Sequence, residues 1–206
     1  RGVPPRGTIT DAYGAPLALN VRTFNINAYP VDLQKDENIS MVSAVLQRNG
    51  IPMDKVKLKE LVEKQYSAPY RAITVTGNLT FSQVTELVMD KDFSSLMFFT
   101  PVWRRTYPAG KFAAHVVGYV AEITKKELEA KDASMYKGGD SIGKNGIEAW
   151  YEEDLHGTAG EEVIEVDSRG RKLRDIRYIE SKSGKDIRLT IDLAAQRYAA
   201  DLIGGY

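Results

Sequence analysis

The spacing of apolar residues changes along this chain, and that change limits the possible folds more than any other feature of the sequence. From Phe24 to Tyr29 apolar and polar residues alternate, which is typical of a strand with one buried face. From Ser40 to Gly50 they recur at helical spacing, with Ser40 placed to cap a helix and Gly50 to end it. The apolar face of that helix would carry Met41, Val42, Val45 and Leu46. Short strands and helices that alternate in this way predict an α+β fold.

Turn and capping residues mark further short elements. Asp11 and Gly14 favour a tight reversal, so residues 8–10 and 17–19 are expected to form a β-hairpin. The other elements expected before Pro108 are a strand at residues 70–76 that ends at Gly77, a strand at residues 96–103, and helices that begin after Asp54 and after Thr80, the second with a capping box closed by Gln83.

Three helices are expected after Pro108. In the first helix the apolar face points inward and includes His115. This histidine is therefore expected to be packed and hydrogen-bonded rather than catalytic. Thr124 with Glu127 caps the second helix. The third follows a glycine-rich loop at residues 137–145. The residues expected to face inward are Phe112, His115, Val116 and Tyr119 in the first helix, and Ile147, Trp150, Tyr151 and Leu155 in the third, with Trp103 as a further core residue and Glu152, Glu153 and Asp154 on a solvated face.

Composition removes several classes of function. The 28 basic and 28 acidic residues cancel, whereas a general nucleic-acid binder needs an excess of lysine and arginine. The chain has no cysteine and only two histidines, so disulfides, thiol catalysis and thiolate or histidine-rich metal centres are excluded, and we expect neither metal nor cofactor. No stretch approaches the roughly 20 apolar residues of a membrane-spanning helix. Because the chain opens with Arg1 rather than Met, we expect a piece of a longer protein.

Charge is distributed unevenly near the C-terminal end. Residues 147–167 hold eight acidic residues and no Lys or Arg, whereas residues 168–188 hold eight basic and three acidic residues. The turn-forming sequence between these blocks predicts a hairpin in which an acidic strand, residues 161–167, pairs with a basic strand, residues 171–177. This interpretation is favoured over an anion-binding surface.

A serine enzyme is the catalytic alternative. Ser141 and Lys144 match the Ser-x-x-Lys pattern of penicillin-interacting acyltransferases, and residues 182–184 approximate their Lys-Thr-Gly motif. The intermediate Ser-x-Asn motif is missing, and Gly143 predicts a loop where the enzyme needs a helix. The match is therefore interpreted as chance.

Three stretches together resemble the N-terminal, non-catalytic module of class B penicillin-binding proteins. Residues 6–18 are similar to Arg-Gly-x-Ile-x-Asp-Arg-x-Gly-x-x-Leu-Ala, although Ala12 stands where the family has arginine. Residues 105–119 are similar to Arg-x-Tyr-Pro-x-Gly followed by His and Gly-Tyr, and residues 143–160 to Gly-x-x-Gly-x-Glu-x-x-Tyr with a closing Leu-x-Gly-x-x-Gly. The motif residues carried over are Arg6, Gly7, Asp11, Gly14, Arg105, Tyr107, Pro108, Gly110, His115, Gly143, Gly146 and Glu148.

The resemblance implies an elongated α+β pedestal with an inserted head, most like that of penicillin-binding protein 2, the elongation enzyme. It implies a scaffold for a peptidoglycan D,D-transpeptidase at the periplasmic or extracytoplasmic face of the membrane, anchored by a helix outside this chain. Its implied partners are a SEDS-family glycosyltransferase of the RodA class and the protein MreC. The fragment itself would not be an enzyme. A free-standing extracytoplasmic adaptor remains an alternative.

Domain boundaries and contacts follow from this interpretation. We expect an anchor at residues 1–30 and 105–192, a head at residues 31–104, and the start of a catalytic domain or the chain's end at residues 193–206. Arg6 or Arg105 is expected to pair with Glu148 or Asp11, because charge-assisted bonds can lock separate segments together. The candidate partner-binding residues in the head are Met97, Phe98 and Phe99, for which a buried strand is the alternative.

Overall fold

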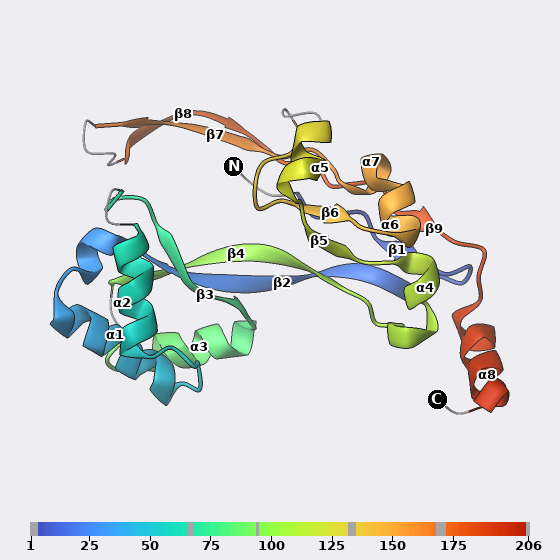
Figure 1. Ribbon diagram of the computed structural model, residues 1–206, viewed down its shortest axis with the longest axis horizontal. Coiled ribbons are helices and arrows are strands. Elements are labelled where there is room, and N and C mark those ends of the chain that lie inside the picture. The colour runs from blue at the N-terminus through green and yellow to red at the C-terminus, as the bar shows by residue number, and fades with distance from the viewer. Residues whose placement is uncertain (1–3, 66–67, 94, 132–134, 168–171, 205–206) are drawn as a thin grey trace. The chain divides into compact units, whose positions relative to one another are not determined.

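The structure is a computed structural model that describes residues 4–65, 68–93, 95–131, 135–167 and 172–204 (Figure 1). It is an α+β fold with two compact units. The first unit contains residues 1–21, 105–163 and 177–206, and the second contains residues 22–104 and 164–176. The predicted head, residues 31–104, lies within the second unit. Among the described residues, no helix is long and apolar enough to cross a membrane.

The first unit is built around a short strand that pairs with partners on both sides. Strand β1 (Ile9–Thr10) pairs antiparallel with the start of β2 (Pro16–Ala28), as the turn at Asp11 predicts, and parallel with β9 (Ile187–Arg188). One hydrophobic core lies against these strands. Its buried residues are Ile9, Leu17, Ala18, Ala109, Ala113, Val117, Leu155 and Leu193.

The remaining elements of the first unit are short. After η2 (Gly110–Phe112) and α4 (Ala114–Val117), strand β5 (Val120–Glu122) pairs antiparallel with β6 (Ser141–Gly143). Helix α5 (Lys125–Ala130) lies between these strands in sequence and has the predicted capping box. Helices α6 (Gly146–Trp150) and α7 (Glu152–Leu155) follow β6, and α8 (Leu193–Gly204) comes last.

The second unit packs helices on a separate core. The end of β2 pairs with β3 (Ile73–Leu79), and β4 (Met97–Thr106) also pairs with β2. The helical elements are η1 (Pro30–Leu33), α1 (Asp36–Arg48), α2 (Lys55–Lys64) and α3 (Phe81–Met89). The helix predicted after Asp54 forms with Asp54 as its cap, and the predicted capping box of Thr80 and Gln83 is present at α3. Strands β2 and β4 each run from one unit into the other.

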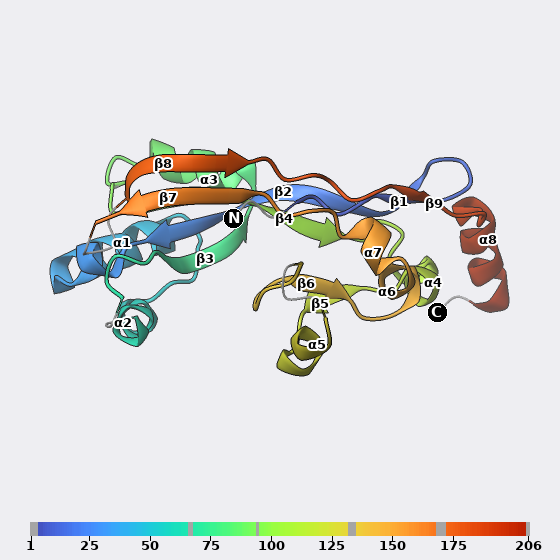
Figure 2. The ribbon, with the colours of Figure 1, turned by 90° about the horizontal axis from the view of Figure 1, so that it is seen from above.

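The charged hairpin forms as predicted. Strands β7 (Glu161–Val166) and β8 (Lys172–Ile179) pair as a two-stranded sheet, and Figure 2 shows them side by side in opposite directions. Arg174 of β8 donates from Nε to Glu165 Oε2 at 2.5 Å, so opposite charges pair across the hairpin. The turn predicted at residues 168–170 and Arg171 lie outside the described residues.

Two predicted boundaries in the second unit are wrong. Helix α1 begins at Asp36 rather than Ser40, whose hydroxyl instead donates to the carbonyl of Asp36 inside the helix, so this serine is not a cap. Strand β3 begins at Ile73 and does not end at Gly77: it continues to Leu79, with Asn78 in the left-handed region at φ 62°. At the strand position of Gly77 a Cβ would lie 2.5 Å from the Asn25 side chain. Glycine, which has no Cβ, fits here without that close contact.

The helix predicted after Pro108 is also wrong. Gly118, at φ 77°, ends α4 after four residues, so Tyr119 falls outside the helix. A Cβ at Gly118 would lie 2.0 Å from the carbonyl oxygen of Asn145, which explains why glycine is needed. The shorter helix turns Ala113 and Val117 inward and leaves His115 exposed. His115 is therefore a surface residue, with its Nε2 lying 3.4 Å from Nε2 of Gln196.

Candidate functional site: a buried arginine and glutamate cluster

The first unit contains a buried cluster of two arginines and two glutamates. Helix α6 carries Glu148, whose side chain is completely buried, and α7 carries Glu152 one turn later. Arg6 comes from the chain before β1, and Arg105 lies near the end of β4. Their side chains are 10% and 4% exposed. Buried charges of this kind persist only when they are paired and hydrogen-bonded.

Glu148 lies between the two guanidinium groups. Its Oε2 accepts from Arg6 Nε at 2.6 Å, and its Oε1 accepts from Arg105 Nε at 2.8 Å. Arg6 Nη2 also donates to the Glu148 carbonyl at 2.8 Å and to Glu152 Oε2 at 2.6 Å. The predicted pairing of Arg6 or Arg105 with Glu148 is therefore confirmed, and both arginines take part.

Arg105 pairs with one carboxylate, Glu148, whereas Arg6 pairs with two. The Nη1 of Arg105 donates to the Gly7 carbonyl at 2.7 Å, and at 3.4 Å to the side-chain oxygen of Asn20. Its Nη2 is buried and has no hydrogen-bond partner in the described part of the chain. The side-chain amide of Asn20 also donates to the carbonyl of Arg6. Asn20, Arg6 and Gly7 thus hold the N-terminal segment against β2 and β4.

Two tyrosines complete the cluster. Tyr107 donates to Glu148 Oε1 at 3.3 Å and accepts the backbone N–H of Val120 at 2.9 Å. Burial, together with the charge of Glu148, raises the pKa of Tyr107 to about 12. Tyr136 donates to Glu152 Oε1 at 2.9 Å, and burial, with the charge of Glu152, raises its pKa as well. Both hydroxyls therefore remain protonated donors at neutral pH.

Ion pairing outweighs burial at Arg6 and Glu152. Burial alone would lower the pKa of Arg6, but its bonds and charge interactions with Glu152 and Glu148 leave that pKa raised. Burial alone would raise the pKa of Glu152, yet Arg6, the Gly143 N–H and Tyr136 hold it below its usual value. Glu152 is therefore an ionised, fully partnered carboxylate rather than an acid or base available for catalysis.

The first glycine of the motifs allows close packing beside the cluster. A Cβ at Gly7 would lie 1.8 Å from the carbonyl oxygen of Lys185, on the segment leading into β9. Gly7 also donates its N–H to the Leu155 carbonyl at 2.8 Å. Only a residue without a side chain fits between these two backbones.

Asp11, the alternative partner predicted for Arg6 or Arg105, instead binds backbone N–H groups. Its Oδ1 accepts the backbone N–H groups of Tyr13 and Ala15, which fixes the hairpin turn, and its Oδ2 accepts the N–H of Leu193 at the start of α8. Burial alone would raise the pKa of Asp11, but these backbone donors hold it below its usual value. Asp11 therefore joins the first hairpin to α8 rather than to an arginine.

The helical stripe predicted between residues 147 and 155 is wrong at its charged and aromatic positions. Trp150 is 83% exposed and Trp103 is also exposed, so neither is a core residue. Glu152, predicted on a solvated face, is buried. Helices α6 and α7 are separate, because Tyr151 leaves helical geometry at φ −105° and ψ 29°. The buried face consequently presents Glu148, Glu152 and Leu155.

The other predicted motif residues have backbone roles. Gly146, at φ 59°, approaches the Val116 carbonyl, and Gly143 donates its N–H to Glu152. Gly14 and Gly110 have positive φ and open space around them, so they serve turns. Pro108 is exposed between Tyr107 and η2.

The serine alternative lacks the geometry it needs. Ser141 opens strand β6, opposite Glu122 of β5, instead of a helix. The ammonium of Lys144 donates to Glu127 Oε2 at 2.6 Å, so it is held by a carboxylate of α5. Lys144 is therefore unsuited to act as the base for Ser141. Among the described residues, no group of three or more His, Cys, Asp or Glu could hold a metal ion.

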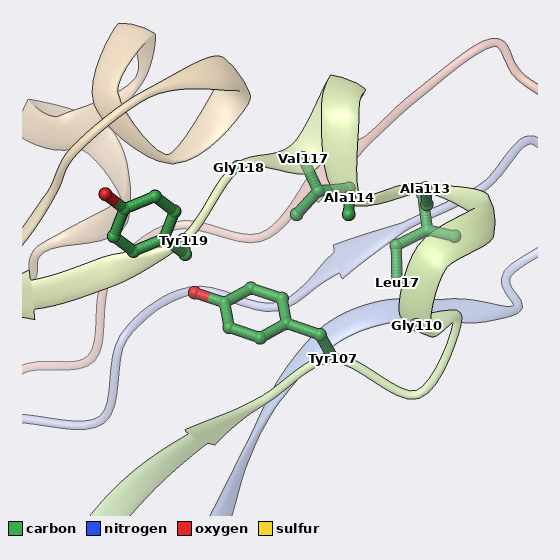
Figure 3. A pocket seen from close by; sticks show the side chains of 8 residues that line it. All are labelled: Leu17, Tyr107, Gly110, Ala113, Ala114, Val117, Gly118 and Tyr119. Atoms are coloured by element: carbon green, nitrogen blue, oxygen red, sulfur yellow. The ribbon is translucent and has the colours of Figure 1, made fainter.

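A small apolar pocket lies beside Tyr107. It has a volume of about 260 Å³, and Figure 3 shows the rings of Tyr107 and Tyr119 on one side and Leu17 on the other. The remaining lining residues are Gly110, Ala113, Ala114, Val117 and Gly118. This lining offers van der Waals contact and no acid–base pair, so the pocket is not equipped for catalysis.

The candidate partner-binding residues divide into two kinds. Met97 is buried in the core of the second unit, and Phe99 packs against that core with its ring stacked on Phe93 at 5.6 Å. Met97 is therefore not available to a partner, and the buried-strand alternative holds for it, whereas Phe99 is half-buried like Phe98. Phe98 is half-buried, and its ring lies 5.2 Å from the ring of exposed Tyr29.

The cluster joins three separate segments of the first unit, residues 6, 105 and 148–152, and each carboxylate oxygen in it already accepts a hydrogen bond. Residues 1–189 match the model of the penicillin-binding protein dimerisation domain, and the chain belongs to that family. The resemblance seen in the sequence is confirmed. Sequence analysis found Arg6, Arg105 and Glu148, but it missed Glu152, Tyr136 and Asn20, which lie outside the recognised motif positions.

Several relatives extend this assignment. The peptidoglycan D,D-transpeptidases MrdA of Haemophilus influenzae and Escherichia coli are each 34% identical over 206 residues, which is 98% of this chain and 31% and 32% of those proteins. Penicillin-binding protein 3 of Bacillus subtilis is 30% identical over 196 residues, 94% of this chain and 28% of that protein. The chain therefore spans about a third of the length of these relatives.

A solved structure shares the fold. It is described as a complex between penicillin-binding protein (PBP2) and MreC from Helicobacter pylori, and it matches with a TM-score of 0.72 at 23% identity. The match covers 98% of this chain and 37% of that chain. Its identity is low, so this likeness bears on the fold.

Proposed function

We propose that this chain is the non-catalytic pedestal of a peptidoglycan D,D-transpeptidase that works in cell-wall elongation. It positions the catalytic domain and offers a surface to other proteins of wall synthesis. Its place is the periplasmic or extracytoplasmic face of the membrane. The MrdA relatives are about three times as long as the segment they share with this chain. Their name, peptidoglycan D,D-transpeptidase, supports that activity for the parent protein.

The buried cluster is the observation that carries this proposal. It joins residues 6, 105, 148 and 152, which come from three separate parts of the chain, through charge-assisted bonds of 2.6 to 2.8 Å. Every carboxylate oxygen of Glu148 and Glu152 accepts at least one hydrogen bond. Such an arrangement makes a rigid support, and it leaves no free nucleophile or base at its centre.

Two partners are proposed. MreC is supported by the fold shared with a penicillin-binding protein described in complex with MreC. A SEDS-family glycosyltransferase of the RodA class rests on the family resemblance alone. Half-buried Phe98 together with exposed Tyr29 is the proposed anchor for MreC, because aromatic residues often dominate binding energy at interfaces.

Labelling with fluorescent penicillin tests the non-catalytic assignment. We expect no covalent label on the wild-type chain under conditions where a complete transpeptidase is labelled. A label that appears on the wild type and disappears in Ser141→Ala would contradict the proposal and favour the serine alternative.

Binding to the MreC of the same organism tests the docking surface. Phe98→Asp should weaken binding about tenfold or more, the loss of roughly 1.4 kcal/mol or more typical of an aromatic anchor. Val56→Asp is the matched control, because Val56 is an exposed apolar residue on α2 of the same unit. Far-UV circular dichroism should show that both variants fold. Equal affinities for Phe98→Asp and wild type would remove Phe98 from the interface.

A further inference from the structure

Strand β8 has one edge without a partner strand in the described part of the chain. It pairs with β7 in a sheet of only two strands. A two-stranded hairpin is marginally stable by itself, and an open strand edge is a template for pairing with another chain. β8 therefore has both the geometry and the energetic reason to accept a further strand.

The side chains along β8 are unusually apolar for an exposed strand. Leu173 and Ile176 are 61% and 60% exposed, and Tyr178 is also exposed. Arg174 and Arg177 lie between them and are exposed too. Exposed β-branched and aromatic residues on an open edge are the residues that cross-strand pairs use.

The sequence of β8 is complementary to itself when read in the opposite direction. Residues 172–180 read Lys-Leu-Arg-Asp-Ile-Arg-Tyr-Ile-Glu. If two copies of this strand pair antiparallel about Ile176, four kinds of pair form on each side of the centre. The pairs are Lys172 with Glu180, Leu173 with Ile179, Arg174 with Tyr178 and Asp175 with Arg177.

Each of these pairs is favourable. Two join opposite charges, one joins two aliphatic residues, and Arg174 with Tyr178 allows a cation–π contact. Ile176 meets its own copy at the centre. No like charges oppose each other, although the segment holds three basic and two acidic residues.

We propose that two copies of this chain associate by antiparallel pairing of β8 with β8, centred on Ile176. The result is a continuous four-stranded sheet with strand order β7, β8, β8 of the second copy, β7 of the second copy. A two-fold axis passes through the centre, so the interface is self-complementary and closes after two subunits. The proposal does not depend on the proposed function, and it assigns a surface to the dimerisation named by the family description.

Neighbouring registers are disfavoured by charge. Pairing centred on Asp175 would place Asp175 opposite its own copy, and pairing centred on Arg177 would oppose two arginines. A register displaced by one residue would set Arg177 opposite Ile176 and Asp175 opposite Tyr178. Like charges directly opposite one another destabilise the registers centred on Asp175 and Arg177, and the register displaced by one residue loses the opposite-charge pairs, so the register centred on Ile176 is favoured over these three.

Single cysteines test the register, because the chain has no cysteine of its own. In Ile176→Cys the two new residues lie directly opposite, where Cα atoms are about 4.5 to 5.5 Å apart and a disulfide can form. Leu173→Cys is the matched control, since its exposure is nearly the same. Its two copies would lie six residues apart along the strand, about 20 Å. Mild oxidation should therefore link Ile176→Cys into a dimer and leave Leu173→Cys monomeric.

The double variant Leu173→Cys with Ile179→Cys supplies the opposite control. It should link as efficiently as Ile176→Cys, because residues 173 and 179 of the two copies face each other in the proposed register. Equal linkage of Ile176→Cys and Leu173→Cys, or no linkage of Ile176→Cys, would overturn the proposal.

Charge reversal tests the energetics on the full chain. Sedimentation equilibrium over a wide concentration range should show a reversible dimer for the wild type. Arg177→Asp should raise the dissociation constant at least about tenfold, because it opposes two acidic residues on each side of the axis. Asp175→Arg with Arg177→Asp should restore the wild-type value. The proposal would be refuted by a wild type that stays monomeric at every concentration, as expected if another protein's strand occupies this edge. It would also be refuted if the double variant had a dissociation constant no lower than that of Arg177→Asp.

Discussion

Replacing Glu148 with alanine should destabilise the first unit strongly. The substitution removes the carboxylate that lies between Arg6 and Arg105 and accepts from Nε of both. Arg6 would keep Glu152 at 2.6 Å, but Arg105 would keep only the Gly7 carbonyl and the long contact with Asn20. A guanidinium that is 4% exposed would then be buried without a counter-charge.

The expected loss is large because water cannot reach the unpaired, buried charge of Arg105. Removing one partner of a buried ion pair costs roughly 3 to 5 kcal/mol. A typical domain is stable by about 5 to 15 kcal/mol, so the unit would lose about a fifth of its stability or more. Glu148→Gln should fall between wild type and alanine, because the amide keeps the shape and one acceptor oxygen but not the charge.

Urea unfolding followed by far-UV circular dichroism measures the effect, and hydrogen exchange locates it. The Val120 and Gly143 N–H groups, which bond to Tyr107 and Glu152, should lose protection. Glu153→Ala is the matched control, since Glu153 is the exposed neighbour of Glu152 on α7 and its loss removes the same charge. A Glu148→Ala protein within about 0.5 kcal/mol of Glu153→Ala would refute the reasoning.

Three further outcomes are expected. Because the pKa of Glu152 is lowered by folding, its contribution is complete above its ordinary pKa and should be lost as the pH falls below about 4.5, which a series of urea midpoints would show. Because the pKa of Tyr107 is raised to about 12, stability should also fall as the pH rises from about 10 towards 12. Tyr107→Phe should reduce that alkaline loss and leave the part that Tyr136, whose pKa is also raised, contributes. Gly7→Ala should lower the free energy of unfolding by about 3 kcal/mol, because its Cβ clashes with the Lys185 carbonyl. Gly14→Ala should lower it by about 1 kcal/mol, because only the positive φ is strained there. Denaturant midpoints measure both losses, and equal losses would contradict the close approach at Gly7.

Local chemistry made part of this fold predictable. The turn at Asp11, the caps at Asp54, Thr80 and Thr124, and the hairpin of opposite charges depend on residues close in sequence, and all of them form. The pairing of Arg6 with Glu148 was predictable for another reason. Arg6 and Glu148 have opposite charges and lie in motifs that resemble the same family. An ion pair between them satisfies the hydrogen-bonding groups of both side chains.

The errors share one physical cause. Apolar periodicity assumes that a helix buries its apolar side, which placed Trp150 inside and Glu152 outside. Here the inward face is set by two arginines that come from residues 6 and 105, and these lie more than 40 residues away in sequence from the glutamates they pair with. The exposure of His115 has a similar origin, since Gly118 ends its helix where the Asn145 carbonyl approaches. Tertiary contacts therefore overrode the local pattern.

The same reasoning explains why the sequence revealed a family before it revealed a core. Apolar core positions accept many combinations of similar volume, so they leave weak signatures in a single sequence. A buried carboxylate shared by two guanidinium groups accepts almost no substitute, and neither does a glycine 1.8 Å from a backbone oxygen. The motif residues whose contacts are hardest to replace are thus Arg6, Gly7, Arg105 and Glu148, and hydrogen bonds centred on the Arg105 guanidinium and the Glu148 carboxylate connect them in the first unit.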